Sequence, residues 1–260
     1  MASRNCVWQP ISSGRRAMLK FRYAALALTL LGTPINAEPT EILIRVISQD
    51  AKFIGDSMGG AQILVRDTNS GKQLAKGITA GTTGDTKAIM EAKGRSPKRA
   101  TPDAASYTAR INIKKPTLVE VVVNGSQSSR DSRAQVTSQR WIVPGESFNL
   151  GDGWVIELPG LAITPSVTRK ARSLQVDAKV ELLCGCPITP GGLWDSADYE
   201  VRAMLWNGNT LLESAKLNFV EAPGRFAGAI DLPEKGRFRL KLFARNMRTG
   251  NSGLVDVKVD

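Results

Sequence analysis

The sequence predicts an all-β protein in which two antiparallel β-sandwich domains follow a cleaved signal peptide. Short apolar segments recur along the chain, with turn residues about every ten positions. Several segments alternate between apolar and polar residues, most clearly from Leu174 to Leu182, as in strands with one buried face. A basic segment and a short apolar run precede them, after Met18, and this order is typical of an exported chain.

The N-terminal segment has the three parts of a secretory signal. Two basic residues precede an apolar run from 23 to 31, which is shorter than the ~20 residues that cross a bilayer. Small and turn-forming residues then lead to a plausible cleavage site near Ala37. We expect Met18 to be the true start, with residues 1–37 forming an upstream extension and the signal peptide. The mature chain is then periplasmic or secreted, in an oxidising compartment.

Residues 38–164 are predicted to form the first sandwich. Residues 61–79 form a hairpin whose loop contains Gly71. The residues from Val65 to Thr79 read V-x-D-x-x-S-G-K-x-L-A-x-G-x-T, which resembles the opening of transthyretin-like and carboxypeptidase-regulatory-like domains. This resemblance implies a small β-sandwich and assigns no functional site.

Two local features are also predicted within this domain. Asp85 or Thr86 is placed to cap a short helix over residues 86–93. Asn124-Gly125 is a typical turn sequence and is predicted to end the strand at residues 117–123.

The second sandwich is predicted at residues 173–260, after a linker at 165–172. The linker contains Pro165 and several polar or basic residues. From Phe238 through Thr249-Gly250-Asn251 the chain resembles bacterial periplasmic immunoglobulin-like modules. That resemblance implies an immunoglobulin-like sandwich.

Composition excludes several kinds of catalytic site. The chain has no histidine, which removes the usual Ser-His-Asp and Cys-His sites and all imidazole metal ligands. Gly84 is followed by Asp85 rather than lysine, so the phosphate-loop pattern is not met. We predict no catalytic residue and a protein that is not an enzyme. Asp195 and Asp198, beside Trp194, are expected to solvate and cap a loop.

The net charge gives little support for nucleic-acid binding. The chain carries +11, but residues 1–37 hold five of the 35 basic residues and no acidic residue. The rest, with 30 basic and 24 acidic residues, has a net charge of +6. Its densest basic run, residues 93–99, lacks the stacking aromatics of a nucleic-acid interface and is predicted to be a solvated loop.

Cys184 and Cys186 are the most distinctive chemical groups of the mature chain. On an extended strand their side chains share one face, ~6.6 Å apart, near the upper limit for a disulfide. Gly185 lets the chain bend, and Pro187 favours the end of the strand. An unbroken strand would place both thiols in the core, whereas a bend would place them at the rim, where ligand loops lie.

Four interpretations of this pair stay open. It is a local structural disulfide, a soft-metal site for copper(I), a thiol–disulfide exchange site or bond to a partner, or two inert thiols. A copper site would use Cys184 and Cys186, with Met204 or Met58 as a thioether ligand. The spacing and the missing imidazoles argue against zinc.

These observations lead to three functional hypotheses. The first is an exported accessory or binding protein that acts through its loops or sheet edges on another periplasmic or envelope protein. The second is copper(I) handling, and the third is thiol–disulfide exchange. The mature chain is expected to have no membrane span and no nucleic-acid partner.

Overall fold

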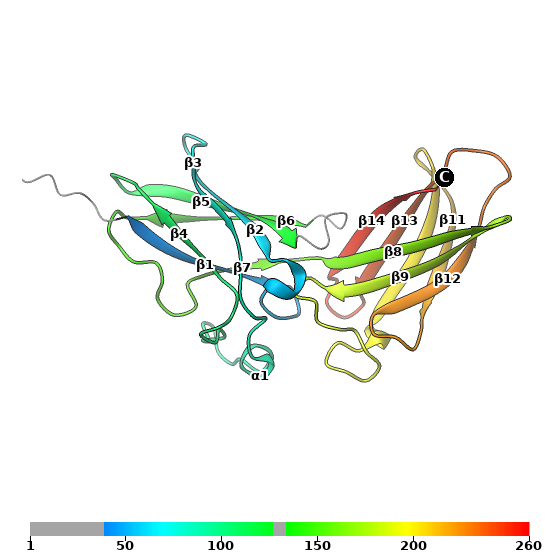
Figure 1. Cartoon of the computed structure of the whole chain (residues 1–260), viewed down its shortest axis with the longest axis horizontal. Helices are drawn as coiled ribbons and strands as arrows, with labels where there is room; N and C mark the ends of the chain where they lie inside the picture. Colours follow the sequence, from blue (N-terminus) through cyan, green and yellow to red (C-terminus); the bar gives the residue numbers. More distant parts are fainter. Residues whose placement is uncertain (1–38, 127–133, 260) are drawn as a thin grey trace, which may run out of the picture. The chain divides into compact units, whose positions relative to one another are not determined.

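The computed structural model describes residues 39–126 and 134–259. The predicted upstream extension, signal peptide and cleavage site lie outside the described residues. The described chain consists mostly of strands (Figure 1), as the sequence predicts. No helix within it combines the length and the apolar character that crossing a membrane requires.

Two sheets pack face to face in the N-terminal half. The larger sheet has the order β3-β2-β5-β6, and the smaller has the order β4-β1-β7, in which only the β1–β7 pair is parallel. Their strands are β1 (Thr40–Ser48), β2 (Ala61–Asp67), β3 (Gln73–Ile78), β4 (Tyr107–Ile111), β5 (Thr117–Ser126), β6 (Gln135–Ile142) and β7 (Trp154–Leu158).

Alternating apolar residues build the core between these two sheets. Ile42 and Ile44 of β1 pack in one cluster with Val119, Val121 and Val123 of β5. All five are fully buried, because every second side chain of a strand points to the same face. The predicted sandwich-like packing of this half is therefore present.

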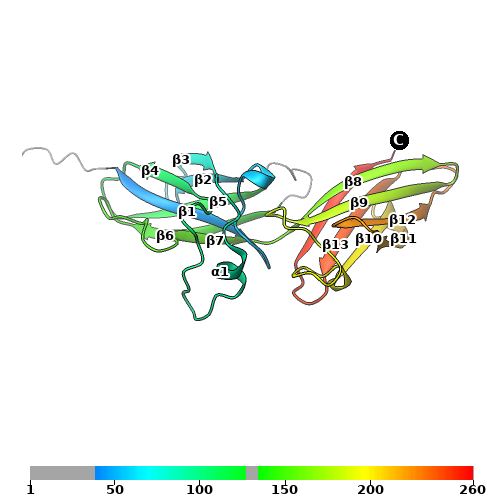
Figure 2. The same cartoon turned by 60° about the horizontal axis from the view of Figure 1, so that its bottom comes forward.

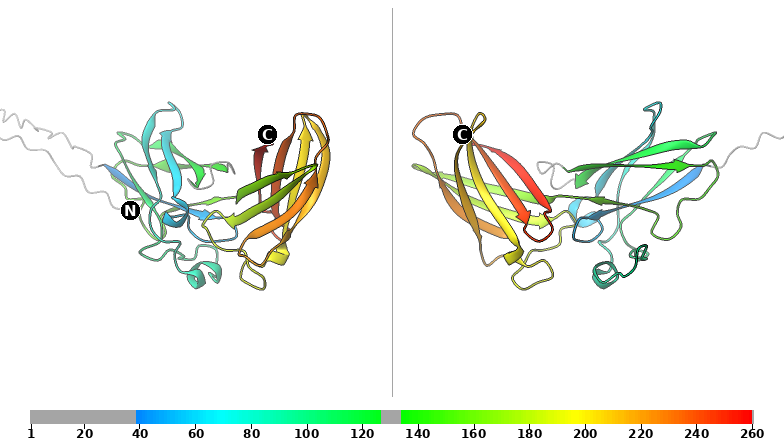
Figure 3. Two further views of the ribbon diagram at one scale, coloured as in Figure 1. Left: turned by 45° about the vertical axis from the view of Figure 1, so that its right-hand side comes forward. Right: turned by 180° about the vertical axis from the view of Figure 1, so that it is seen from behind.

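The C-terminal half contains one seven-stranded sheet with the order β14-β13-β10-β11-β12-β9-β8. Only two residue pairs join β11 to β12, so the sheet bends there and its two parts enclose a common core. Figure 3 shows the sheet curling. The strands are β8 (Leu161–Lys170), β9 (Ser173–Leu182), β10 (Tyr199–Asn207), β11 (Thr210–Phe219), β12 (Arg225–Asp231), β13 (Arg239–Asn246) and β14 (Ser252–Lys258).

The curl brings the first and last strands of this sheet together. A Cβ atom at Gly253 of β14 would lie 2.3 Å from the carbonyl oxygen of Leu161 in β8. Glycine is required there because any larger residue would collide with backbone. The sheet is thus nearly closed at this end. The two sheets of the predicted sandwich are therefore a single bent sheet in this half of the chain.

Two predictions about connections are wrong. Residues 165–170 are the second half of β8, paired with β9 along its length, and not a linker. Pro165 is tolerated because β8 is the outer strand of its sheet. Asn124 and Gly125 do not form a turn but continue β5, where Asn124 pairs with Gln135.

Residues 79–106 form an excursion between β3 and β4 that carries α1 (Thr86–Met90). Figure 2 shows it beside β1 and β7. Asp85 caps the helix as predicted, since its Oδ1 accepts the Ala88 N–H at 2.7 Å. The helix ends at Met90, earlier than the predicted residue 93.

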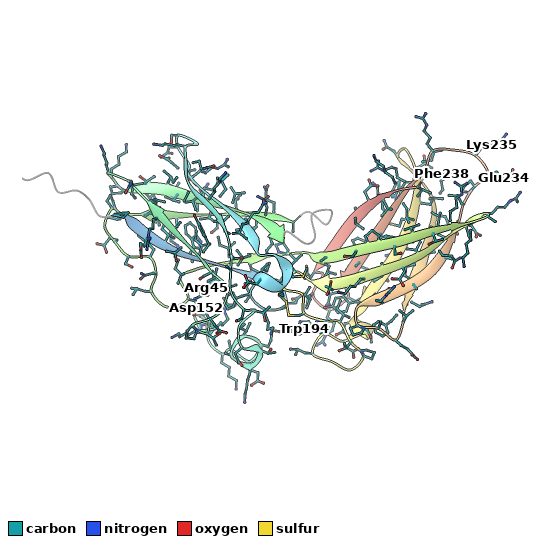
Figure 4. All side chains as sticks on the ribbon, viewed as in Figure 1. Arg45, Asp152, Trp194, Glu234, Lys235 and Phe238 are labelled. Carbon is teal, nitrogen blue, oxygen red and sulfur yellow. A yellow bond between two sulfur atoms is a disulfide. The ribbon has the colours of Figure 1, made fainter. Side chains whose placement is uncertain are left out.

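A buried arginine attaches this excursion to β1. Arg45 donates hydrogen bonds to the carbonyl oxygens of Ala104 and Ala105 and stacks 5.8 Å from the centre of the Phe53 ring. Burial lowers its pKa, and the charge of Asp152 opposes that effect. Figure 4 shows Arg45 and Asp152 in the same region.

Candidate functional site

The cysteines lie in a tight turn at the end of β9. The Gly185 N–H donates to the Leu182 carbonyl oxygen at 2.7 Å, and Gly185 has a φ of +77°. Glu181 then pairs with Pro187 in an isolated antiparallel bridge. The chain therefore bends at glycine, as the sequence suggests, and doubles back on itself.

The bend does not bring the sulfur atoms to the surface. Cys184 and Cys186 are joined by a disulfide, with their Cα atoms 5.5 Å apart. They are 1% and 4% exposed and belong to the core of the seven-stranded sheet. The backbone turns away from the strand here. Both cysteine side chains nevertheless point into the core, as the buried residues of β9 do.

The outer side of this turn contacts the N-terminal half. The Ser57 hydroxyl donates to the Cys184 carbonyl oxygen at 3.0 Å. A Cβ atom at Gly185 would lie 3.1 Å from the sulfur atom of Met58. Met58 belongs to the core of the two N-terminal sheets, whereas the cysteines belong to the other core. The backbone of the turn therefore separates the thioether from the disulfide.

A second set of contacts holds the turn that follows β1. The Trp194 indole N–H donates to the Asp50 carbonyl oxygen at 2.8 Å, and the Thr249 hydroxyl donates to the Asp50 carboxylate at 2.5 Å. Asn251 donates to the Gln49 carbonyl oxygen at 3.3 Å. Trp194, labelled in Figure 4, thus contributes to the packing between the two halves of the described chain.

The other residues considered for chemistry have local roles. Asp195 caps a short 3-10 helix, and its hydrogen bond from the Ala197 N–H is the largest cause of its lowered pKa. Asp198 pairs with Arg248 at 3.3 Å. Met204 alternates with buried residues of β10 and therefore faces away from the core that holds the cysteines. Within the described residues, no group of three or more acidic, cysteine or histidine side chains is arranged to hold a metal ion.

A different surface is the better candidate: the outward face of the sheet β3-β2-β5-β6, which we call the amide face. Strand alternation and register place fourteen side chains on it. They are Gln62, Leu64, Arg66, Gln73, Lys76, Ile78, Leu118, Glu120, Val122, Asn124, Gln135, Thr137, Gln139 and Trp141.

Trp141 is the most unusual residue of this face. It is 60% exposed, on the outer strand β6 and directly opposite Leu118 of β5. An exposed tryptophan is a large apolar surface with one polar tip, and such residues are enriched where proteins bind their partners. No role is predicted for Trp141 from the sequence.

A hydrogen-bonded network fixes the centre of the amide face. The Arg66 Nε donates to Glu120 at 2.6 Å, and the Gln139 amide donates to the other oxygen of the same carboxylate at 3.0 Å. The bond from Gln139 is the largest cause of the lowered pKa of Glu120, and the bond from Arg66 is the next. Glu120 is buried although it lies on the outward face, so both donors are held by a carboxylate that has little access to water.

Comparison with known proteins identifies no family. No protein-family model matches the chain, and no protein of curated function matches it. Solved structures with a similar arrangement include a DUF3823 family protein from Bacteroides ovatus, at 10% identity and a TM-score of 0.32, covering 85% of this chain and 98% of that one.

Two further solved structures are a protein of Bacteroides uniformis provisionally described as carbohydrate-binding, and the fimbrial anchor protein Mfa2 of Porphyromonas gingivalis. The first has 11% identity and a TM-score of 0.27, over 85% of this chain and 99% of that one. The second has 9% identity and a TM-score of 0.22, over 85% and 82%. Likenesses at these TM-scores carry no argument about function.

Proposed function

We propose that the protein is an exported, non-enzymatic binding protein that presents the amide face to a ligand of the cell envelope. The observation that supports this most strongly is the exposure of Trp141 on a sheet face whose neighbouring polar groups are already fixed by the Arg66–Glu120–Gln139 network. Rigid polar groups beside an exposed aromatic ring are typical of a binding surface, because little side-chain entropy remains to be lost on binding.

The disulfide has a structural role in this proposal. Attack on a disulfide requires that a thiolate reach one of its sulfur atoms, and both residues are buried in a core. The disulfide fixes the turn that contacts Ser57 and Met58. Export into an oxidising compartment, expected from the N-terminal segment, would maintain the bond. We therefore do not propose thiol–disulfide exchange.

The test is binding to a cell-envelope preparation. Mature protein, obtained by expressing the full-length chain, is mixed with washed envelopes and sedimented. The wild type is expected to sediment with them, and Trp141→Ala is expected to bind at least about tenfold more weakly, since an interfacial tryptophan commonly contributes 2 kcal/mol or more. Leu211→Ala, an exposed apolar residue of β11 in the other sheet, is the matched control.

Cys184→Ser combined with Cys186→Ser separates this function from sulfur chemistry. If the variant folds, it is expected to sediment as the wild type does, because the cysteines are not on the amide face. Equal sedimentation of wild type and Trp141→Ala, or no sedimentation of the wild type, would refute the proposed function.

Copper(I) handling is a second candidate because Cys184 and Cys186 lie side by side in the same turn. Reduction of the pair would provide two thiolates, which are soft ligands, whereas Met58 lies on the other side of the turn backbone and is not proposed as a ligand. The test is titration of reduced protein with copper(I) against a competing chelator. Loss of affinity in the double serine variant would support a copper site, and equal affinity in the two proteins would exclude one.

A further inference from the structure

We propose that the ligand of the amide face is an uncharged polysaccharide and that a sugar ring stacks on the indole of Trp141. This inference rests on the proposed function, because it names the ligand class of the same surface. Three features of the face support it: its low net charge, the position of Trp141 and the geometry of Gln139.

The amide face carries little net charge. Its charged residues are Arg66, Lys76 and Glu120, and Arg66 and Glu120 form an ion pair. Only Lys76, on the opposite outer strand from Trp141, is left without an opposite charge on this face. A surface without a strong field of one sign does not attract a charged ligand from a distance.

Five of the fourteen side chains are amides: Gln62, Gln73, Asn124, Gln135 and Gln139. An amide offers two donors and one acceptor oxygen, so it can bond to a hydroxyl group as donor and as acceptor at once. Hydroxyl groups have the same double character. Gln62, Asn124 and Gln135 are neighbours across three strands, and the Gln135 amide donates to the Asn124 carbonyl oxygen at 2.8 Å. Such amides complement the rim of a sugar ring better than they complement a phosphate or a carboxylate, which only accept hydrogen bonds at neutral pH.

Trp141 supplies the apolar part of the site. The C–H groups of a pyranose ring form a flat apolar face, and the exposed indole is a flat apolar surface of comparable size. Leu118 lies opposite Trp141 on β5 and is half-buried, so it supports the ring from the neighbouring strand. Stacking on the indole and hydrogen bonding to Gln139, the neighbouring amide on the same face of β6, can then occur together.

Gln139 is positioned for this role. It precedes Trp141 by two residues, so the two side chains share a face at ~6.8 Å along β6. Its Nε2 donates to Glu120 at 3.0 Å, which directs its carbonyl oxygen away from that carboxylate. A hydroxyl group of a sugar stacked on Trp141 is within reach of that oxygen. Because Glu120 already holds the side chain, binding costs little additional entropy.

A protein partner fits this face less well. Stable protein interfaces bury about 800 Å² on each side around an apolar centre. Here the central aliphatic side chains, Leu64 and Val122, are half-buried or buried, and the exposed apolar residues Trp141 and Ile78 lie on opposite outer strands. The mostly polar exposed groups and the single exposed aromatic ring suit a narrow chain of sugars.

The direct test is native affinity electrophoresis of the mature protein in gels that contain a soluble β-glucan, a mannan or a xylan. Polygalacturonate serves as the anionic comparison. At least one neutral polysaccharide is expected to retard the wild type, Trp141→Ala to abolish the retardation, and Gln139→Ala to weaken it by about tenfold, which corresponds to about 1.4 kcal/mol. Leu211→Ala should migrate as the wild type does. Thermal unfolding of each variant checks that it is folded.

Two results would overturn the inference. They are no retardation of the wild type by any of the three neutral polysaccharides, whether or not polygalacturonate retards it, and equal retardation of wild type and Trp141→Ala. The envelope assay separates this failure from failure of the proposed function. If envelope binding survives periodate oxidation of sugars and is lost after protease treatment, the ligand is a protein, so the proposed function stands and the polysaccharide is excluded.

Discussion

The indole N–H of Trp194 donates a hydrogen bond to the carbonyl oxygen of Asp50, 2.8 Å away, and thereby joins two loops that are 144 residues apart in the chain. Asp50 has a φ of +63°, which is unusual for a residue other than glycine. The Thr249 hydroxyl holds its carboxylate from a third loop. The turn after β1 is thus fixed by two loops that join strands of the seven-stranded sheet.

Trp194→Phe is expected to lower the free energy of unfolding by about 1 kcal/mol, because it removes one hydrogen bond and keeps most of the ring. Trp194→Ala should cost about 2–3 kcal/mol, since it also removes packing against the core. Urea unfolding followed by circular dichroism measures both. Leu193→Ala, at the exposed neighbouring position, should change stability by less than about 0.5 kcal/mol. Full stability of Trp194→Phe would show that the bond contributes nothing.

The disulfide between Cys184 and Cys186 is expected to contribute about 1.5 kcal/mol, because it closes a very short loop in the unfolded chain. Replacing both cysteines with alanine should lower the melting temperature by about 3–6 °C. In the native wild type, a thiol reagent should modify neither cysteine until the protein is both reduced and unfolded. Rapid labelling of the folded protein without reductant would contradict the bond and the burial together.

Gly185→Ala should be more destabilising than Gly191→Ala. Both glycines have positive φ values, +77° and +64°, so each substitution introduces backbone strain of about 1 kcal/mol. At position 185 the new methyl group would also lie 3.1 Å from the Met58 sulfur, whereas nothing lies within 4 Å at position 191. The difference between the two melting temperatures isolates the contact with Met58. Equal destabilisation would mean that Met58 moves away without cost.

The strands were predictable because their side chains alternate. The buried residues of β9, from Leu174 to Leu182, are those that the period-two pattern indicates. The same pattern could not show that β8 crosses residues 165–170, because Pro165 resembles a linker residue in sequence. Its tolerance depends on β8 being an outer strand, and neighbours in a sheet are a property of the fold rather than of the segment.

The candidate site was harder to predict than the fold. The two cysteines are the most distinctive reactive residues of the sequence, which made them the predicted site. Their burial, however, depends on the direction in which one turn places its side chains. The amide face had a signal, since Gln135, Thr137, Gln139 and Trp141 occupy alternate positions of one strand. Its meaning required the register with β5, which brings Glu120 opposite Gln139.

Asp152→Ala is expected to expose the basic segment of residues 93–99 to protease. The Asp152 carboxylate accepts hydrogen bonds from the backbone N–H groups of Arg99 at 2.7 Å and Ala100 at 3.1 Å, and these bonds hold the C-terminal end of the basic segment. Limited trypsin digestion should therefore cut the variant within residues 93–99 several times faster than the wild type. Glu146→Ala, at an exposed position of the loop before β7, is the control. Equal cleavage rates would show that other contacts hold the segment.

Glu120→Gln should destabilise the protein at pH 7 and have a smaller effect in acid. Hydrogen bonds from Gln139 and Arg66 lower the pKa of Glu120 in the folded protein, below its unfolded value of about 4.3. The stabilisation is therefore complete above that unfolded pKa and is lost as the pH falls through the folded pKa. We expect a cost of about 1–2 kcal/mol at pH 7, because the substitution removes the charge that both donors contact. Melting temperatures of the two proteins, measured from pH 7 downward for as long as both stay folded, should approach each other as Glu120 becomes protonated in the wild type. A difference that stays constant over this range would show that the charge of Glu120 does not stabilise the amide face.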